Sequence, residues 1–357
     1  MNFEPTEDRR MLSDTLRRFL GDEYGWEHRN AVAYDAPFRD PDLWAQLVEL
    51  GVLLALVPEE QGGFGGAGFD IATVFEALGR AICPEPVLPA LMAARLLGAA
   101  GEDPEPLMTG AIAYAVGIGE LDAPYDMGGI AAEATRDGDG WRVSGRKSVV
   151  YGGHVADRLL VAARNGDGLS VLAVEAADAE VIGYGLIDGG GAAEIVLDGA
   201  PARMLIEDGT AALADALDAG TLALCAEAVG ALDVAYETTL DYLRTRKQFG
   251  ASIGGFQALQ HRMVDLMGEI EQARSITILA ASRLGGPEGP RTVSMAKSLI
   301  GRTARLCAEE AVQMHGGIGI TWEHPISHYA KRLVMIDHQL GDTDWHLERV
   351  MEGLDAA

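Results

Sequence analysis

The spacing of apolar residues changes twice along this chain of 357 residues, and these changes limit its possible folds more than any other feature. In the first hundred or so residues, apolar positions recur at helical spacing, as in the segments Met11–Leu20 and Leu43–Leu54. From about Thr109 short alternating segments follow, and from about Glu207 the helical spacing returns. The pattern predicts helical, β and helical regions in that order.

The middle region has the features of β-hairpins. Two glycine-containing turns, Asp137–Gly140 and Asn165–Gly168, separate short apolar runs. No helix-length segment lies between these runs, so we expect an antiparallel barrel or sandwich rather than a βαβ sheet. The expected strands are 111–119, 131–134, 141–143, 159–163, 169–174 and 193–197.

Three domains follow from this pattern: an N-terminal helical domain (1–108), a middle β domain (109–206) and a C-terminal helical bundle (207–357). The length allows two or three packed units. In the first domain a helix is expected from about Asp70, and Pro84, Pro86 and Pro89 then interrupt the chain. The long apolar stripes of the last domain are typical of a four-helix bundle.

The composition excludes several classes of partner and site. A formal net charge of −26 disfavours binding to nucleic acid and to anionic membranes. The three cysteines have no CxxC spacing, which argues against disulfides and a zinc site, and we expect no metal site. The N-terminus lacks the apolar core of a signal peptide, and no run of 18 apolar residues is present, so we expect a cytoplasmic protein without a membrane span.

Two motifs in the C-terminal region carry features of a ligand site. The first, Arg246-Lys247-Gln248-Phe249-Gly250, closes a long helix, and Gln257 follows it. An arginine beside a glycine turn can hold a phosphate through its planar donors, although a basic pair at a helix end also interacts with the helix dipole. The second, from Gln313 to Gly319, contains three glycines in four residues, more than a helix cap needs, and this favours a ligand-facing loop.

In this order and separation, the two motifs resemble those of the acyl-CoA dehydrogenase family. The segment Val57–Gly65 resembles the N-terminal motif of that family, and the resemblance covers essentially the whole chain. It implies the acyl-CoA dehydrogenase fold, an acyl-CoA thioester as substrate, FAD as cofactor and an electron-transfer flavoprotein as acceptor. It also implies a homo- or heterotetramer in which FAD lies across a subunit boundary.

The resemblance assigns roles to residues of the two motifs. Arg246 and Gln257 would contact the pyrophosphate region of FAD, and Gln248 and Phe249 belong to the same binding segment. On the adenosine side, the family pattern places Gln313, Met314, Gly316 and Gly317.

The middle domain departs from the family pattern. The threonine that hydrogen-bonds the flavin ring is replaced by Gly119, and the serine near the pyrophosphate by Tyr125. In a second motif, the aromatic residue beside the flavin is replaced by Val149 and a small hydroxyl residue by Tyr151. Two tyrosines would clash with the flavin ring or fill its place, unless other contacts hold FAD.

The glutamate that serves the family as catalytic base is also missing. Aligned on the glycine its position is Leu340, aligned on the following helix it is Asp342, and the alternative family position is Gly220. Asp342 is the candidate base, although an aspartate ahead of a helix is more often its N-cap.

Within the family, the chain most resembles the small subunit of pimeloyl-CoA dehydrogenase and related non-identical subunits, including those of steroid side-chain degradation. This resemblance rests on Gly341-Asp342 and on the stretch Lys147–Val150. It leads to the hypothesis of an α₂β₂ heterotetramer in which this chain donates half of a partner's FAD site. The alternatives are a self-sufficient homotetramer that uses Asp342, a flavin monooxygenase on the same fold, and a structural subunit that binds no flavin.

Overall fold

The computed structural model describes residues 6–355 and contains two compact units, each built from separate stretches of chain. One unit comprises the described residues of Met1–His28 together with Gly68–Cys83 and Thr221–Ala357. The other comprises Arg29–Ala67 and Pro84–Gly220. The long helix α7 (Thr210–Thr245) passes from the second unit into the first at Thr221.

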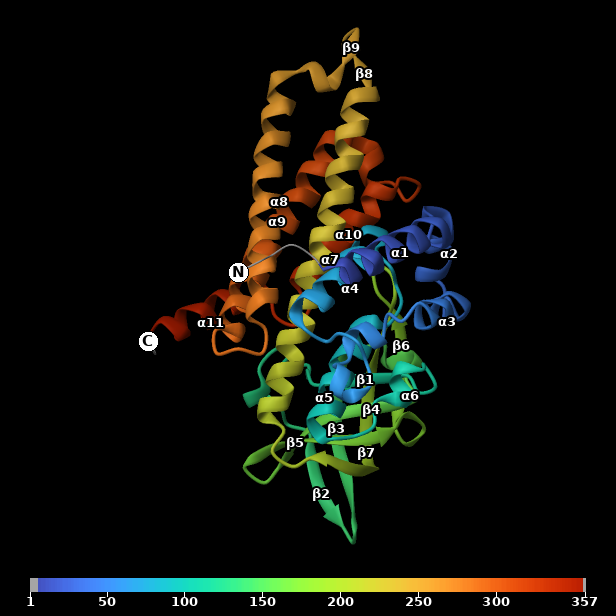
Figure 1. Ribbon diagram of the computed structural model, residues 1–357, viewed down its shortest axis with the longest axis vertical. Coiled ribbons are helices and arrows are strands. Elements are labelled where there is room, and N and C mark those ends of the chain that lie inside the picture. The colour runs from blue at the N-terminus through green and yellow to red at the C-terminus, as the bar shows by residue number, and fades with distance from the viewer. Residues whose placement is uncertain (1–5, 356–357) are drawn as a thin grey trace. The chain divides into compact units, whose positions relative to one another are not determined.

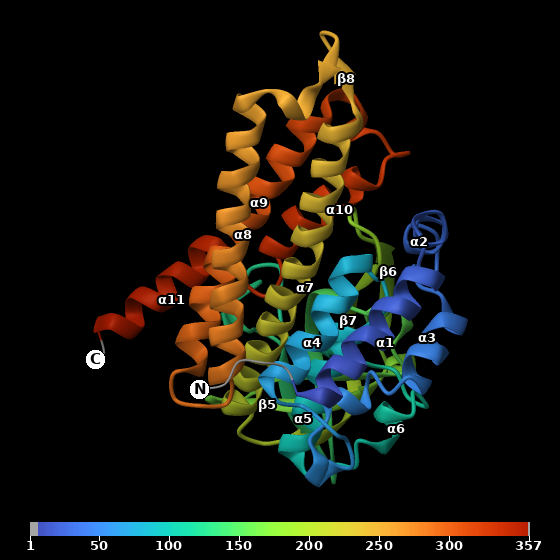
Figure 2. The ribbon, with the colours of Figure 1, turned by 45° about the horizontal axis from the view of Figure 1, so that its top comes forward.

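The first unit is a helical bundle. Figures 1 and 2 show α7, α8 and α9 running side by side, with a small hairpin where α7 leads into α8. The remaining helices of the unit pack along them. Their bounds are α1 (Glu7–Glu23), α4 (Gly68–Ala81), α8 (Gln257–Arg283), α9 (Gly289–His315), α10 (Pro325–Asp337) and α11 (Thr343–Asp355).

Small residues bring helices of this bundle close together. A Cβ atom at Gly230 of α7 would lie 2.1 Å from the carbonyl oxygen of Glu76 of α4, so only glycine fits there. By length and composition α7 could cross a membrane, but 83% of its most apolar window is buried within the protein. That burial is typical of a core helix in a soluble protein.

The second unit contains a β barrel. Strands β2 (Glu133–Asp137), β3 (Gly140–Tyr151), β7 (Gly191–Ile206), β5 (Gly168–Glu175) and β4 (Arg158–Asn165) pair in that order, and β4 pairs with β2 to close the ring. Strand β6 (Glu180–Gly185) pairs with β7, and β1 (Tyr114–Gly117) pairs with β4. Both expected turns lie between paired strands.

Helices and short turns complete the second unit. They include α3 (Pro41–Glu49), α5 (Val87–Ala100) and α6 (Glu105–Met108), while α2 (Trp26–Ala33) spans the division between the units. Turns of 3-10 helix lie at Leu54–Leu56, Glu59–Gln61, Met127–Gly129, Gly153–Val155, Ala176–Asp178 and Ile253–Gly255, the last of these in the bundle.

The order of helical, β and helical regions is confirmed, with two corrections in detail. Pro84 and Pro86 lie in the break between α4 and α5, and Pro89 lies in the first turn of α5, where the missing N–H costs nothing. Strand β6, with mostly exposed residues, was not predicted. The pairings of β1 and β2 with β4 are parallel, whereas the others in the barrel are antiparallel.

Candidate functional site

The first motif lies where α7 ends. The hairpin of β8 (Lys247–Gln248) and β9 (Ala251–Ser252) joins α7 to α8, and Phe249 at its tip has a left-handed φ of 54°. The side chain of Phe249 is 93% exposed and meets the ring of Phe256 edge-on. Arg246 is exposed beside the hairpin, and Gln257, the first residue of α8, is also exposed. The motif therefore presents its side chains to solvent.

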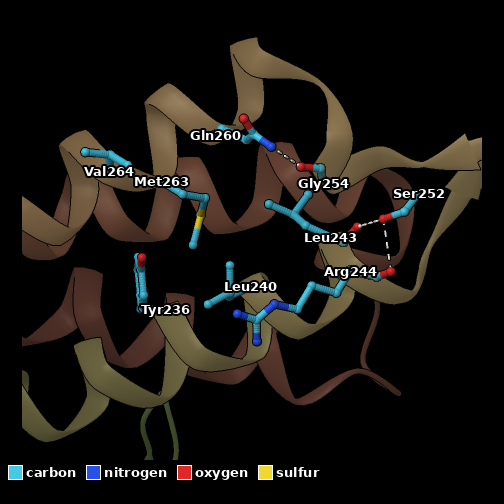
Figure 3. Close-up of a pocket in the computed structure, with 9 residues that line it drawn as sticks. All are labelled: Tyr236, Leu240, Leu243, Arg244, Ser252, Gly254, Gln260, Met263 and Val264. Atoms are coloured by element: carbon cyan, nitrogen blue, oxygen red, sulfur yellow. Dashed lines mark hydrogen bonds between the residues drawn. The ribbon is translucent and has the colours of Figure 1, made fainter.

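A pocket of about 450 Å³ lies between α7 and α8 next to this hairpin (Figure 3). The hydroxyl of Ser252 donates to the carbonyl oxygens of Leu243 (2.8 Å) and Arg244 (3.0 Å), which fixes the hairpin to the end of α7. Across the pocket, the side-chain amide of Gln260 donates to the carbonyl oxygen of Gly254 at 2.9 Å. These polar contacts explain why the hairpin has a defined position although its tip is exposed.

The second motif ends α9 and continues into a 3-10 turn, η7 (Gly316–Ile320). Met314 is buried against Leu243 and Met263, so its side chain anchors the motif in the core. Gln313, Gly316 and Gly317 are exposed. Gly316 has φ 65° and ψ −144°, a conformation open essentially to glycine alone, and this explains one of the three glycines.

An aromatic contact brings the two motifs together. The ring of Tyr242 stacks on the imidazole of His315, with ring centroids 4.4 Å apart and an angle of 24° between the planes. The hydroxyl of Tyr242 donates to the carbonyl oxygen of His315 at 3.3 Å. Because Tyr242 lies one turn before Arg246 and His315 directly precedes Gly316, the two predicted segments lie at one end of the bundle.

The basic groups of the first motif have no acidic partner in the part of the chain that the structure describes. Among residues 6–355, the side chains of Arg246 and Lys247 make no ion pair, although the chain contains 54 aspartates and glutamates. An exposed guanidinium without an ion-pair partner among the described residues is suited to a phosphate group.

In the β barrel, the residues that match the family pattern form a buried ion pair. Nζ of Lys147 lies 2.6 Å from Oε1 of Glu120 and also donates to the carbonyl oxygen of Ile118. The backbone N–H groups of Ala131 and Ala132 donate to the same carboxylate. Burial lowers the pKa of Lys147, while burial of Glu120 is outweighed by these hydrogen bonds, which hold its pKa below the usual range.

The residues that depart from the family pattern lie beside this pair. The backbone closes over Gly119, because a Cβ there would lie 2.9 Å from the carbonyl oxygen of Pro124. Val149 lies at a register shift between β3 and β7, is partly exposed, and has φ 51°, which is unusual for a β-branched residue. Tyr125 and Tyr151 are half-buried.

Glu194 holds the strained turn at Val149. Its carboxylate accepts hydrogen bonds from the N–H of Val149 (3.2 Å) and from the hydroxyls of Ser148 (2.9 Å) and Tyr184 (3.3 Å). Burial and the nearby carboxylate raise the pKa of Tyr184 to about 12, so its hydroxyl stays protonated and donates. These hydrogen bonds fix the turn, and they occupy the Glu194 carboxylate.

The candidate base is engaged in the fold. Oδ1 of Asp342 accepts a hydrogen bond from the N–H of Trp345 at 2.9 Å, so its carboxylate caps α11. Leu340, the other aligned position, has a left-handed φ of 55° and carries no acid. Gly220, the third position, lies within α7.

A buried lysine supports the loop that precedes Asp342. Nζ of Lys297 donates to the carbonyl oxygens of Asp337 and Gly341. Burial lowers the pKa of Lys297 to about 8. The nearby His346 is also buried, which lowers its pKa to about 3 and keeps it neutral as it contacts the Leu340 carbonyl oxygen. The loop is therefore firmly built although it presents no glutamate.

Comparison with known proteins identifies the family. The acyl-CoA dehydrogenase N-terminal domain matches residues 6–103, and the acyl-CoA dehydrogenase C-terminal domain matches residues 207–354. The acyl-CoA dehydrogenase IpdE2 of Mycobacterium tuberculosis is 32% identical over 333 residues, which cover 92% of this chain and 91% of that protein. The chain belongs to the acyl-CoA dehydrogenase family.

Solved structures are also similar to this chain along its whole length. A variant of the Tcur3481–Tcur3483 steroid ACAD is 30% identical, with a TM-score of 0.89 and coverage of 98% of each chain. The ChsE4–ChsE5 complex of Mycobacterium tuberculosis is 26% identical, with a TM-score of 0.91 and coverage of 100% of each chain. Members of the family are FAD-dependent oxidoreductases.

The two regions of this acyl-CoA dehydrogenase differ in how well they fit FAD. At the end of the bundle, a Cβ atom at Gly316 or Gly317 would meet no atom within 4 Å. Arg246, in the other motif, makes no ion pair among the described residues. The exposed guanidinium of Arg246 fits a phosphate of FAD, and the open glycine loop leaves room for the adenosine side. In the barrel, the backbone fills the place where a Gly119 side chain would lie, and a family hydroxyl is absent from that position. This region does not fit the family's flavin contacts.

Sequence reasoning missed the residues that support both regions. Tyr242 and His315 touch across 73 residues of sequence, and the pair of Glu120 and Lys147 spans 27. The hydrogen bonds of Lys297 in the described part of the chain go to backbone carbonyl oxygens, for which the sequence contains no signal. Glu120 and Lys147 directly follow or precede positions that depart from the family pattern, Gly119 and the segment at Val149, so their neighbourhood was marked although their pairing was not.

Proposed function

We propose that this chain is a subunit of an α₂β₂ acyl-CoA dehydrogenase that donates the pyrophosphate and adenosine half of an FAD site to a sister subunit. The observation that carries the proposal is the contrast between the two regions. The exposed Arg246 and the open loop at Gly316 and Gly317 fit a phosphate-bearing ligand, whereas the barrel lacks the family's flavin contacts.

Within this proposal the residues of the bundle bind and orient the cofactor. The guanidinium of Arg246 and the amide of Gln257 bind the pyrophosphate, and Gln248 and Phe249 border it. Gln313, Met314, Gly316 and Gly317 line the adenosine side, where glycines permit close approach of the backbone. Bound FAD supplies the acceptor for the hydride that leaves the β-carbon of the acyl-CoA thioester.

The acid–base step is assigned to the sister subunit. A base must point at the α-carbon of the thioester in a dry pocket. In this chain the Asp342 carboxylate is held by the first turn of α11, and the other two aligned positions are Leu340 and Gly220. The chain therefore contributes binding and orientation, and its partner contributes the proton acceptor.

Two similar solved proteins support the assembly. The Tcur3481–Tcur3483 protein and the ChsE4–ChsE5 complex each carry the names of two chains. We extend this arrangement to the present chain as a heterotetramer in the cytoplasm. An electron-transfer flavoprotein would reoxidise the flavin of this assembly.

The first test is the amount of flavin bound by the chain purified alone and together with its sister subunit. Little flavin in the chain alone and about one FAD for each pair of sister chains in the complex is expected. About one FAD per chain in the chain alone would overturn the half-site assignment and favour a self-sufficient enzyme.

A variant of the complex tests the assigned residues. Arg246→Ala should weaken FAD binding by about tenfold or more, because a charge-assisted contact to phosphate is lost. The matched control is Arg305→Ala, which removes an arginine of α9 that is 75% exposed and makes only a long contact to Glu309 at 4.0 Å. Equal FAD affinity in the two variants would remove Arg246 from the site.

A further inference from the structure

Three elements meet on the imidazole of His315. From α7, the ring of Tyr242 stacks on it, and from the segment before α10, His324 meets it edge-on with ring centroids 4.9 Å apart. The turn η7 folds back over it, since a Cβ at Gly319 would lie 2.9 Å from the His315 Cβ. His315 is therefore packed on by the end of α7 and by the glycine-rich turn.

The hydrogen bonds of His315 fix its ring. Its Nδ1 lies 2.8 Å from the carbonyl oxygen of Ala311, and because a carbonyl only accepts, Nδ1 carries the proton. Its Nε2 is buried and has no hydrogen-bond partner in the described part of the chain. Burial lowers the pKa of His315, and the neighbouring His324 lowers it further, so the ring in the stack is neutral.

Tyr242 is connected to the first motif through its backbone. The N–H of Arg246 donates to the carbonyl oxygen of Tyr242 at 2.8 Å, and the carbonyl oxygen of Arg246 accepts from Ile253 at 2.9 Å. The backbone of Tyr242 thus holds the residue that bears the free guanidinium. Its side chain meanwhile holds the carbonyl and ring of His315, one residue before Gly316.

We propose that Tyr242 is a positioning residue for FAD: its stack on His315 sets the separation between Arg246 and the loop at Gly316 and Gly317, so that both reach one cofactor. This inference rests on the proposed function, since it concerns the same half-site. Tyr242 acts through its neighbours and touches no ligand itself. The two ends of the site are otherwise carried by different helices.

The test measures the Kd for FAD of complexes first freed of flavin, together with their thermal unfolding without flavin. Tyr242→Leu removes the stack and should raise Kd roughly tenfold. Tyr242→Phe keeps the stack and loses one long hydrogen bond, so Kd should rise only about twofold to threefold. Rescue by phenylalanine distinguishes positioning by the ring from a general loss of stability.

The matched control is Tyr236→Leu, the same change on the same helix at a similarly half-buried position, which packs against the cluster of Leu243, Met263 and Met314 whereas the ring that stacks on His315 is that of Tyr242. It should leave Kd within about twofold while lowering the unfolding temperature as much as Tyr242→Leu does. Equal rises of Kd in both variants would overturn the inference. Should Tyr242→Leu fail to fold, His315→Leu removes the stack from the other side and must raise Kd in the same way.

The Arg246→Ala variant distinguishes failure of the positioning role of Tyr242 from failure of the proposed half-site. A rise of Kd in Arg246→Ala with unchanged binding in Tyr242→Leu overturns the positioning role and leaves the half-site intact. Unchanged binding in Arg246→Ala overturns both the half-site and the positioning role.

Discussion

Replacing Glu120 by Gln should destabilise the β barrel more than replacing Lys147 by Met, and the double variant should regain part of the loss. The side chain of Lys147 is 0% exposed and that of Glu120 is 11% exposed. In Glu120→Gln the buried ammonium keeps only neutral acceptors, the amide of the new side chain and the carbonyl oxygen of Ile118, and loses its opposite charge. Without Lys147, the carboxylate keeps the N–H groups of Ala131 and Ala132.

The magnitudes follow from these remaining partners. Deprotonating a lysine of ordinary pKa costs about 4.6 kcal/mol at pH 7, which limits the loss in Glu120→Gln to roughly 4–5 kcal/mol. Protonating a glutamate of ordinary pKa costs about 3.7 kcal/mol, and two remaining donors reduce the loss in Lys147→Met to roughly 2–3 kcal/mol. The double variant should lose about 1.5–3 kcal/mol less than the sum.

Hydrogen exchange of β3 amides in the native protein measures these losses, because the two compact units need not unfold together. Arg142 and Asp137 provide the control, since this pair bridges β2 and β3 of the same barrel but is largely exposed. Its double-mutant cycle should give less than about 1 kcal/mol. A smaller loss in Glu120→Gln than in Lys147→Met, or a coupling no larger than in the control, would refute the account of the buried pair.

Three further predictions concern other parts of the chain. In the complex, Asp342→Asn should keep both the helix cap and turnover, whereas Asp342→Ala should lose about 1 kcal/mol of stability, and abolished flavin reduction in Asp342→Asn would instead identify a base. Gly301→Ala should destabilise the bundle by about 3 kcal/mol or more, because its Cβ would lie 2.0 Å from Oδ1 of Asp337. Gly268→Ala, whose Cβ would meet nothing within 4 Å, should stabilise the bundle by about 0.5–1 kcal/mol, and urea unfolding of both variants measures these changes. Because the pKa of Glu120 lies below its ordinary value of 4.5, its contribution should be complete above that pH and lost on further acidification, and a barrel stability independent of pH in this range would contradict the assignment.

Much of the fold was predictable because helices and hairpins leave local signals. The helical spacing located α1 and α4, and the glycine turns located the hairpins of β2 with β3 and of β4 with β5. Strand β6 escaped prediction because its residues are mostly exposed and alternate weakly. The closure of the barrel depends on pairings between distant strands, which no local pattern encodes.

The candidate site was predictable only as separate pieces. The sequence predicts Arg246 and the loop from Gln313 to Gly319 as parts of a site, because glycine and arginine in those patterns have a direct chemical meaning. It gave no sign that Tyr242 and His315 join them, since an aromatic residue on a helix usually indicates only core packing. An N-cap role for Asp342 was one of the alternatives predicted from the sequence, and the hydrogen bond from the N–H of Trp345 to its carboxylate agrees with that role.

Residues with strained backbone conformations lie in three of the segments discussed above. Five non-glycine residues of the described part have positive φ: Phe38, Ile82, Val149, Phe249 and Leu340. The last three lie in the altered flavin segment, the hairpin after α7 and the loop at the base position. Such conformations cost roughly 1–3 kcal/mol each and persist only where neighbouring groups enforce them.

Buried polar side chains enforce this strain at the two segments that depart from the family pattern. Glu194 holds the turn at Val149, and His346 and Lys297 hold the loop around Leu340 and Gly341. The contacts of Lys297 connect the loop between α10 and α11 to α9, and the Asp337 carboxylate accepts from Thr343 at the start of α11, so the loop has a structural role that needs no glutamate.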